Sequence, residues 1–312
     1  MIISKTPHRL PLGGGGTDIP EFYSKYEGFW ISAAIDKFVY VAVNSRFESP
    51  IRLAYSKIEI ADEVDDIQHK FMKVALEYFN VRDHVDITTL SDLPSGSGMG
   101  SSCSFAVGLI NALSVYTRMP IKNIAELAFD LDRSLGHPVG KQDQYTALYG
   151  GVRVYTVNKA GTVMNKVMIV PGLEEHLSLF YTNTTRDANP ILVKVGNDNE
   201  NMLKIMEIGE KSFTALDSCQ YDAFGELLDE HWKAKRMIAP EMTSPEIDRV
   251  YDSAIRAGAL GGKIIGAGGG GFLLFYTRKN QDKAKLIKAM STMGLPYVPF
   301  KFYPDGSRVI DA

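Results

Sequence analysis

Two hydrophobic patterns alternate along the first half of the chain. Short runs in which apolar and polar residues alternate predict strands, whereas apolar residues at three- and four-residue spacing predict helices. In the clearest helical run, Phe105, Leu109 and Leu113 fall on one face directly after a glycine-rich segment. The first half is therefore predicted to combine a sheet with helices, with strands at 38–43, 51–55, 85–90 and 152–157 and helices at 63–79, 99–117 and 121–134.

The second half repeats both patterns after a break at Pro171 and Gly172, which is typical of a linker. At 312 residues the chain exceeds the usual size of a single hydrophobic core, so two lobes are expected, residues 1–170 and 171–312 of an α+β protein. The predicted elements of the second half are strands at 177–181, 263–265, 272–276 and 297–302 and helices at 199–217, 220–238, 245–257 and 280–293.

Composition narrows the class of protein. A hydrophobic content of 45% suffices for full cores, but no stretch has the apolar length of a membrane helix. The chain reaches Pro7 and Arg9 before a signal-peptide core could form, so we expect a cytoplasmic protein.

Two cysteines support no disulfide framework, and the six histidines show no metal-ligand spacing. A net charge of −3 without a basic tract argues against a nucleic-acid partner, and a homodimer is compatible with the sequence but not required by it.

The glycine-rich segment at residues 94–104 is the strongest indication of function. Gly96, Gly98 and Gly100 stand at alternate positions, and hydroxyl residues and the predicted helix follow them. Glycines allow the backbone to approach a ligand, and a helix N-terminus offers unpaired N–H groups to an anion. The segment therefore predicts a phosphate-binding loop, with a simple serine-capped turn as the alternative.

Two other nucleotide-binding patterns fit this chain poorly. A Walker loop would need one more residue between Gly136 and Lys141, and Gln142 stands where it requires a hydroxyl. The glycine run at 266–271 satisfies Gly-x-Gly-x-x-Gly, but a predicted strand follows it instead of a helix. No acidic residue follows at the distance needed to hold a ribose. The sequence therefore argues against a dinucleotide oxidoreductase.

Two further clusters supply the remaining parts of a phosphoryl-transfer site. Residues 6–18 join the cation Arg9, a run of glycines and the carboxylate of Asp18. Residues 140–145 place Asp143 among polar neighbours. Phosphoryl transfer needs positioned phosphates, a metal, a cation near the γ-phosphate and a group that orients the nucleophile. The sequence offers candidates for all four.

In this order, the three glycine-containing segments resemble the motifs of the GHMP kinases, the superfamily of galactokinase, homoserine kinase, mevalonate kinase and phosphomevalonate kinase. Residues 7–18 resemble the first motif, residues 94–102 the second, with Met99 where the family carries Leu, and residues 266–271 the third. The resemblance implies a two-lobed fold, with an N-terminal lobe like ribosomal protein S5 domain 2 and a ferredoxin-like C-terminal lobe. ATP, Mg²⁺ and a small-molecule acceptor would lie between the lobes.

Within that superfamily, residues 14–20, 32–37 and 140–145 are most similar to D-glycero-D-manno-heptose 7-phosphate kinases. This resemblance implies transfer of the γ-phosphate to the anomeric oxygen of heptose 7-phosphate. The 1,7-bisphosphate formed would serve the synthesis of nucleotide-activated heptose and of bacterial surface polysaccharide. Fucokinase-type domains share much of this sequence, so a kinase of unphosphorylated fucose or galactose is one alternative, and a non-catalytic nucleotide or sugar sensor is another.

The resemblance also implies catalytic roles. Arg9 would face the transferred phosphoryl group, and Asp143 would accept the proton of the attacking hydroxyl. The alternatives are a surface salt bridge for Arg9 and a structural hydrogen bond near a helix start for Asp143. The ATP-binding positions implied by the second motif are Pro94, Gly96, Ser97, Gly98, Met99, Gly100, Ser101 and Ser102.

The implied metal ligands are Ser102 and Asp132, where this chain carries Asp instead of the family's Glu. Asp130 is an alternative ligand two positions away, and Asp132 could instead pair with Arg133 or Lys141. Mg²⁺ prefers hard oxygen ligands and retains bound waters, so a water could bridge the shorter side chain to the ion.

The substrate side is expected to include Asp18, which would hold sugar hydroxyls unless Thr17 and Asp18 cap a turn. Lys141 would contact substrate or phosphate, or would extend to solvent. Arg186 would grip the distal phosphate of the sugar, unless it is an ordinary exposed loop arginine. The expected substrate contacts are Gly15, Thr17, Asp18, Lys141, Arg186, Gly268 and Gly269.

Overall fold

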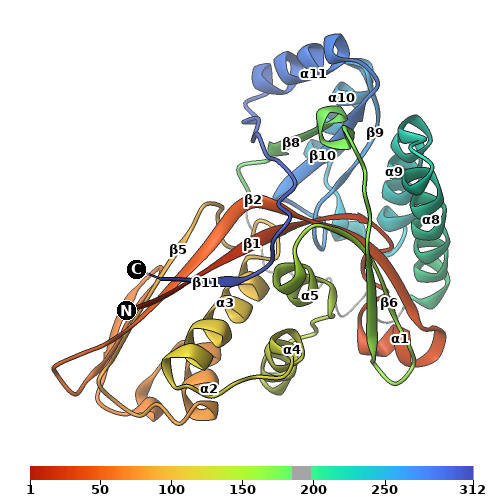
Figure 1. Ribbon diagram of the computed structural model, residues 1–312. Coiled ribbons are helices and arrows are strands. Elements are labelled where there is room, and N and C mark those ends of the chain that lie inside the picture. Colours follow the sequence, from red (N-terminus) through yellow and green to blue (C-terminus); the bar gives the residue numbers. More distant parts are fainter. Residues whose placement is uncertain (185–197, 312) are drawn as a thin grey trace.

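The computed structural model of this protein describes residues 1–184 and 198–311. Figure 1 shows a large sheet with helices on one side and a smaller sheet with its own helices on the other. No helix within these residues is long and apolar enough to cross a membrane. The first half forms β1 (Ile2–Gly13), α1 (Pro20–Tyr26), β2 (Gly28–Ser45), β3 (Ile51–Ala54), β4 (Ile58–Ala61), η1 (Val64–Asp66), α2 (Lys70–Tyr78), β5 (Val85–Ser91), α3 (Ser101–Tyr116), α4 (Ile124–Ser134), α5 (Gln142–Tyr149), β6 (Val152–Val157) and β7 (Val163–Val167).

The second half builds the smaller sheet and the helices around it. The three strands of this sheet are antiparallel, in the order β8-β10-β9. Its elements are α6 (Leu173–His176), β8 (Leu177–Tyr181), α8 (Asn199–Asp217), α9 (Tyr221–Arg236), η2 (Pro240–Met242), α10 (Pro245–Arg256), β9 (Ala259–Ile264), β10 (Phe272–Thr277), α11 (Asn280–Thr292) and β11 (Arg308–Asp311).

The long strand β2 organises the large sheet, whose order is β11-β1-β2-β5-β3-β4. β2 pairs with β1 along most of its length, with β6 near its start and with β5 near its end. The pairing of β1 and β2 shifts register after Pro7 and again after Pro11, because a proline cannot donate to the ladder. These irregularities lie on either side of Arg9, a residue of the candidate site.

Two apolar cores position the site between them. One core lies between the large sheet and helices α2, α3 and α4, and it includes Val41 and Leu109. The other joins the two sheets, because Leu12 of β1 packs in one cluster with Phe224 of α9 and Phe272 of β10. Segments from both halves of the chain border the candidate site, and these buried contacts fix their relative positions.

The structure confirms most of the predicted helices and most of the predicted strands. The predicted helix at 63–79 is a short 3₁₀ turn followed by α2, and the predicted strand at 297–302 is wrong, since it forms only isolated bridges at Tyr297 and Phe302. β1 did not stand out because its buried His8 and Arg9 interrupt the apolar pattern. The prediction also missed α1, β4, α5, β7, α6 and β11.

The C-terminal segment returns to the large sheet. β11 pairs antiparallel with the start of β1, with Ile2 opposite Asp311 and Lys5 opposite Arg308, so the two ends of the chain lie side by side (Figure 1). The boundary at residue 170 stays a prediction. The last strand nevertheless belongs to the sheet of the first half and not to the sheet of the second.

Candidate active site

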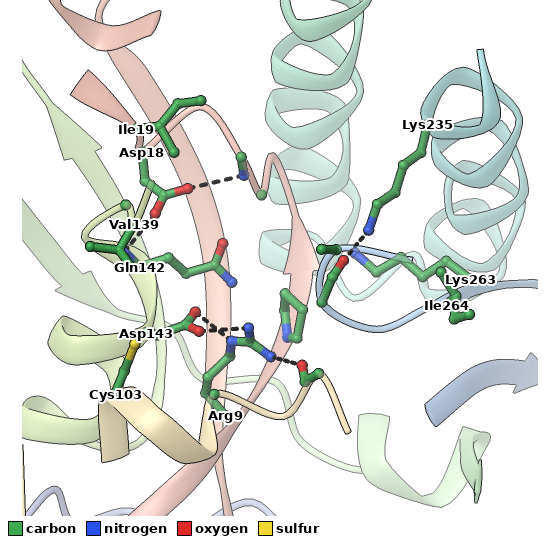
Figure 2. A pocket seen from close by; sticks show the side chains of 18 of the residues that line it. Arg9, Asp18, Ile19, Cys103, Val139, Gln142, Asp143, Lys235, Lys263 and Ile264 are labelled. Carbon is green, nitrogen blue, oxygen red and sulfur yellow. Dashed lines mark hydrogen bonds and ion pairs between the residues drawn. The ribbon is translucent and has the colours of Figure 1, made fainter. Parts of the chain in front are cut away.

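A cavity of about 220 Å³ lies where the large sheet, α5 and the second half of the chain meet. The residues that line it include Arg9, Asp18 and Asp143 from the first half and Lys235 and Lys263 from the second (Figure 2). The cavity is called the first cavity below. It gathers residues that the sequence analysis singled out, Arg9, Asp18 and Asp143 among them, although these are far apart in the chain.

Arg9 and Asp143 form a bidentate ion pair at the floor of this cavity. Arg9 Nε donates to Asp143 Oδ1 at 2.6 Å, and Arg9 Nη2 donates to Asp143 Oδ2 at 2.7 Å. The third guanidinium nitrogen, Nη1, donates to the carbonyl oxygen of Gly98 in the glycine-rich loop. Arg9 thus connects the carboxylate of α5 to the predicted phosphate-binding segment.

The elements around this pair hold it in place. Arg9 extends from β1, and its side chain is only 7% exposed, whereas that of Asp143 is 23% exposed. Asp143 lies in the first turn of α5, where the unpaired N–H groups of the helix favour a negative charge. Because planar Arg–carboxylate pairs with two hydrogen bonds are geometrically specific, the orientation of the Asp143 carboxylate is fixed before any ligand binds.

Asp18 is a second buried carboxylate on the same cavity. Its Oδ2 accepts a hydrogen bond from the backbone N–H of Gln142 at 2.8 Å, and its Oδ1 accepts one from that of Gly16 at 3.0 Å. Burial raises the pKa of Asp18 above its ordinary value, the Gln142 hydrogen bond opposes that shift, and the charge of Asp143 adds to it. Asp18 therefore ties its own loop to the start of α5 beside Asp143.

The segment 94–100, called the phosphate loop below, has the conformation that its glycines predict. Gly96, Gly98 and Gly100 have φ angles of 72°, 80° and 73°, which L-residues rarely adopt. Gly100 is also the N-cap residue of α3, so the unpaired N–H groups of that helix open onto the loop. This is the arrangement of an anion site at a helix N-terminus.

The phosphate loop packs against residues 266–271, called the C-terminal glycine loop below. A Cβ atom on Gly98 would lie 2.6 Å from the carbonyl oxygen of Ile265, and one on Gly271 would lie 2.1 Å from that of Ser97. Because only glycine permits this approach, Gly98, Gly266 and Gly271 serve backbone packing between the two loops.

We expect Gly98→Ala to disturb ATP binding, and Gly136→Ala provides a matched control. The two glycines have nearly the same φ, 80° and 79°, but a Cβ at Gly136 meets no atom within 4 Å. Both variants should lose about 1–2 kcal/mol of unfolding free energy from the left-handed conformation. Only Gly98→Ala should lose more and raise the KM for ATP, measured by chemical denaturation and steady-state kinetics. Equal behaviour of the two variants would contradict the close contact of the loops.

A second cavity, of about 800 Å³, opens on the other side of the phosphate loop. Tyr55, His69 and Phe105 contribute aromatic rings to its lining. Its volume lies in the range of small-molecule sites, and its aromatic rings could stack on the flat base of a nucleotide. The residues that line both cavities are Ser95, Gly96, Ser101, Ser102 and Val139, so the phosphate loop separates the two spaces.

Ser102 and Asp132 both line the second cavity, next to the phosphate loop. Asp132 is buried, and its Oδ1 lies 2.6 Å from Nδ1 of His137. It pairs with neither Arg133 nor Lys141, since these side chains bond Glu21 and Glu126. No group of three or more His, Cys, Asp or Glu residues that could hold a metal occurs in residues 1–184 and 198–311. A hydroxyl and a carboxylate are hard oxygen donors and fit Mg²⁺ that is also held by nucleotide phosphates.

The structure places Lys141 outside the first cavity and contradicts the expected substrate contact. Its Nζ bonds both carboxylate oxygens of Glu126 at 2.7 Å and the carbonyl oxygen of Gly161 at 2.6 Å. The side chain is 5% exposed, so it does not extend to solvent either. Glu126, which binds the Lys141 ammonium, lies on α4. The local sequence around Lys141 gives no sign of this partner.

Lys141→Met should therefore lower stability without changing substrate affinity. Removing Lys141 leaves the Glu126 carboxylate without its ion-pair partner. Because Glu126 is 31% exposed, we expect the free energy of unfolding to fall by only about 2–3 kcal/mol. Thermal or urea unfolding measures that loss, and Lys141→Met combined with Glu126→Gln should recover part of it. A large rise in the KM for sugar phosphate at unchanged stability would restore Lys141 to the substrate site.

Several other predicted contacts have structural partners instead. Thr17 is fully buried, and its hydroxyl donates to the carbonyl oxygens of Gly14 and Phe29. The Ser97 hydroxyl donates to the carbonyl oxygen of Pro94, and the Met99 side chain lies in the apolar core. These side chains shape the loops that border the site, and they line neither cavity.

The remaining predicted substrate contacts divide into three cases. Gly15 lines the first cavity, as expected. Gly268 and Gly269 do not line it, because the loop turns away there and the N–H of Gly269 bonds the carbonyl oxygen of Met242. Arg186 lies outside the described residues.

Sequence analysis missed a group of basic residues on the opposite wall. His231 and Lys235 lie four residues apart on α9, and Lys263 lies on β9; all three line the first cavity. The spacing of His231 and Lys235 places them on one helix face, but nothing in the local sequence distinguishes that face from a solvated one. Only Lys263, three residues before the C-terminal glycine loop, had a nearby motif to mark it.

Comparison with known proteins agrees with this geometry. Residues 66–151 match the GHMP kinases N terminal domain, and residues 212–294 match the GHMP kinases C terminal domain. The D-glycero-alpha-D-manno-heptose 7-phosphate kinase of Campylobacter jejuni is 32% identical over 98% of this chain and 98% of its own. The bifunctional fucokinase/GDP-fucose pyrophosphorylase of Arabidopsis thaliana is 26% identical, and the match covers 90% of this chain but 30% of that protein.

A solved structure shares the whole fold. The D-glycero-D-manno-heptose 1-phosphate kinase of Bacteroides thetaiotaomicron superposes with a TM-score of 0.84 at 25% identity, over 100% of this chain and 99% of that one. The expected resemblance and the expected fold class are therefore confirmed. On its two matched domains, its full-length relative and its fold, this chain belongs to the GHMP kinases.

Proposed function

We propose that this protein is an ATP-dependent sugar kinase that transfers the γ-phosphate to the anomeric oxygen of D-glycero-D-manno-heptose 7-phosphate. The observation that carries the proposal is the position of Arg9, which bonds both carboxylate oxygens of Asp143 and the Gly98 carbonyl of the phosphate loop. A phosphoryl donor on that loop and an acceptor at Asp143 would meet at one guanidinium.

The nucleotide is proposed to occupy the second cavity and the phosphate loop. Its base would lie among Tyr55, His69 and Phe105, and its phosphates would reach the N-terminus of α3. Backbone N–H groups at a helix start bind phosphate oxygens well, and the helix dipole adds to that attraction. Because the phosphate loop borders both cavities, the γ-phosphate would point toward the first cavity and toward Arg9.

Ser102 and Asp132 are proposed to hold Mg²⁺ together with the nucleotide phosphates. When bound, Mg²⁺ would neutralise phosphate charge and fix the phosphates in place. His137 would orient the Asp132 carboxylate, since its Nδ1 lies 2.6 Å from Asp132 Oδ1. The Asp132 carboxylate would then be held in one orientation for binding the ion.

The acceptor sugar is proposed to bind in the first cavity, between Asp18 and Asp143. An ionised carboxylate has about four lone-pair sites, so Asp143 can accept a hydroxyl in addition to the two bonds from Arg9. The anomeric hydroxyl is more acidic than an ordinary alcohol, which suits a carboxylate as its acceptor. Arg9 would offset the negative charge of the transition state, and Asp18 would bond ring hydroxyls.

The names of the relatives support a heptose phosphate as acceptor. The Campylobacter protein is called a heptose 7-phosphate kinase and the Bacteroides protein a heptose 1-phosphate kinase. A panel of heptose 7-phosphate, heptose 1-phosphate, unphosphorylated heptose, fucose and galactose tests the proposal. We expect ATP-dependent turnover with heptose 7-phosphate, with ³¹P NMR of the product showing a new anomeric phosphate.

The same panel separates the alternatives. The second candidate function is phosphorylation of an unphosphorylated sugar, because the Arabidopsis relative is named as a fucokinase. Preference for fucose or galactose over heptose 7-phosphate would select that function. Absence of ADP release with every sugar would instead favour a non-catalytic sensor on this fold.

A further inference from the structure

The wall of the first cavity that faces Arg9 and Asp143 is basic. His231 and Lys235 project from one face of α9, and Lys263 projects from β9. Figure 2 shows Lys235 and Lys263 on the side of the cavity opposite Arg9, Asp18 and Asp143, with their side chains directed toward the same region. Lys235 also bonds the carbonyl oxygen of Gly266 at the start of the C-terminal glycine loop. His231, Lys235 and Lys263 are called the basic wall below.

Two members of the basic wall are buried without a matching acceptor. His231 is 3% exposed and Lys263 is 2% exposed. Neither ring nitrogen of His231 has a hydrogen-bond partner. Within residues 1–184 and 198–311, Lys263 forms no ion pair with a carboxylate. Burying a polar or charged side chain without a hydrogen-bond or ion-pair partner is unfavourable. The position of His231 and Lys263 at a cavity therefore points to a ligand that supplies the missing partners.

Three basic side chains on one wall of a cavity favour an anion as the ligand. Burial lowers the pKa of Lys263 well below its ordinary value, and the charges of Lys235 and Arg9 lower it further. Burial also lowers the pKa of His231, with Lys263 and Lys235 adding to the effect. A dianion among these groups would oppose these shifts by favouring the charged forms of Lys263 and His231. A phosphate monoester offers three acceptor oxygens to such donors.

The arrangement of the two cavities separates this anion from the nucleotide. The phosphate loop borders both cavities, whereas His231, Lys235 and Lys263 line only the first. The first cavity is also the one that holds Asp18 and Asp143, which are proposed to bind the acceptor. The γ-phosphate is proposed to enter this cavity on the side of Arg9, whereas the basic wall lies on the opposite side (Figure 2), so an anion on that wall would belong to the acceptor.

We propose that His231, Lys235 and Lys263 form a second phosphate site, which binds the phosphate group already carried by the acceptor sugar. This inference rests on the proposed function, because it assumes an acceptor at Asp143. It makes the basic wall the part of the protein that distinguishes a sugar phosphate from a free sugar.

The test compares two acceptors that differ only in the phosphate. Lys235→Met and Lys263→Met are assayed with heptose 7-phosphate and with unphosphorylated heptose at saturating ATP. Loss of one charge-assisted hydrogen bond should lower kcat/KM for heptose 7-phosphate by about 10–100-fold. The value for unphosphorylated heptose and the KM for ATP should change less than about threefold.

Lys233→Met is the matched control. Lys233 lies between His231 and Lys235 on α9 but is 70% exposed and pairs with Asp229, so its loss should leave both acceptors unaffected. Melting temperatures show whether each variant folds, and the half-buried Lys235 can be tested even if Lys263→Met fails to fold. Equal losses for the two acceptors, or a rise in the KM for ATP, would overturn the assignment.

Failure of the proposed function is recognised separately. If the wild-type protein phosphorylates none of the sugars, inorganic phosphate is titrated calorimetrically into the protein with ADP already bound. Binding that both Lys235→Met and Lys263→Met abolish, but Lys233→Met retains, would support the phosphate site without the kinase. Absence of phosphate binding by the wild-type protein would exclude the site.

Discussion

Asp143→Asn is expected to lower kcat by about 10²–10⁴-fold, the range for loss of a general base or hydroxyl-orienting group. The amide has nearly the same shape as the carboxylate but cannot take a proton, and its nitrogen would face the guanidinium of Arg9. ATP is proposed to bind on the far side of the phosphate loop, so its KM should change less than about twofold. Steady-state kinetics with both substrates varied measure this separation.

Asp282→Asn serves as the control for Asp143→Asn. Asp282 also lies in the first turn of a helix, is 27% exposed and pairs with a basic side chain, Lys285, but it lies outside both cavities. It should leave kcat unchanged within about twofold. If Asp143→Asn lowered kcat by less than about threefold, Asp143 would have no part in the transfer, and its pairing with Arg9 would be structural.

The parts of the site that the sequence predicted are those encoded in contiguous segments. The phosphate loop is recognisable because its glycines and the helix that follows them are neighbours in the chain. The pairing of Arg9 with Asp143 joins residues 134 positions apart, and only the motif resemblance suggested that both belong to one site. What local sequence specifies is the conformation of a segment, whereas its partners depend on the packing of the whole chain.

The errors have the same cause. Lys141 stands beside Asp143 in sequence, but its side chain points the other way, because Glu126 of α4 and the carbonyl of Gly161 satisfy it. The basic wall was missed because a helix position that faces a cavity in the tertiary structure looks the same in sequence as one that faces water. In the fold, β1 was missed because its buried polar residues serve the site and so break the apolar alternation.

Arg9→Met should lower kcat by about 10²–10³-fold, the cost of removing one group that stabilises transition-state charge. The variant loses three donors at once, two to Asp143 and one to the Gly98 carbonyl. Arg9→Lys keeps the charge but cannot make the planar bidentate contact, so its kcat should fall between those of the wild type and Arg9→Met. Unfolding measurements on each variant separate this effect from the stability lost when Asp143 is left without its partner.

The double variant Arg9→Met/Asp143→Asn decides whether the two residues act as one unit. Each is held by the other, so after one is removed the remaining one is no longer oriented toward the reacting groups. Residues that act together show strongly non-additive losses, and the double variant should be no more than about tenfold slower than the slower single variant. A loss equal to the product of the two single losses would mean that Arg9 and Asp143 contribute independently. In that case the ion pair between them would not be what aligns the acceptor with the phosphate loop.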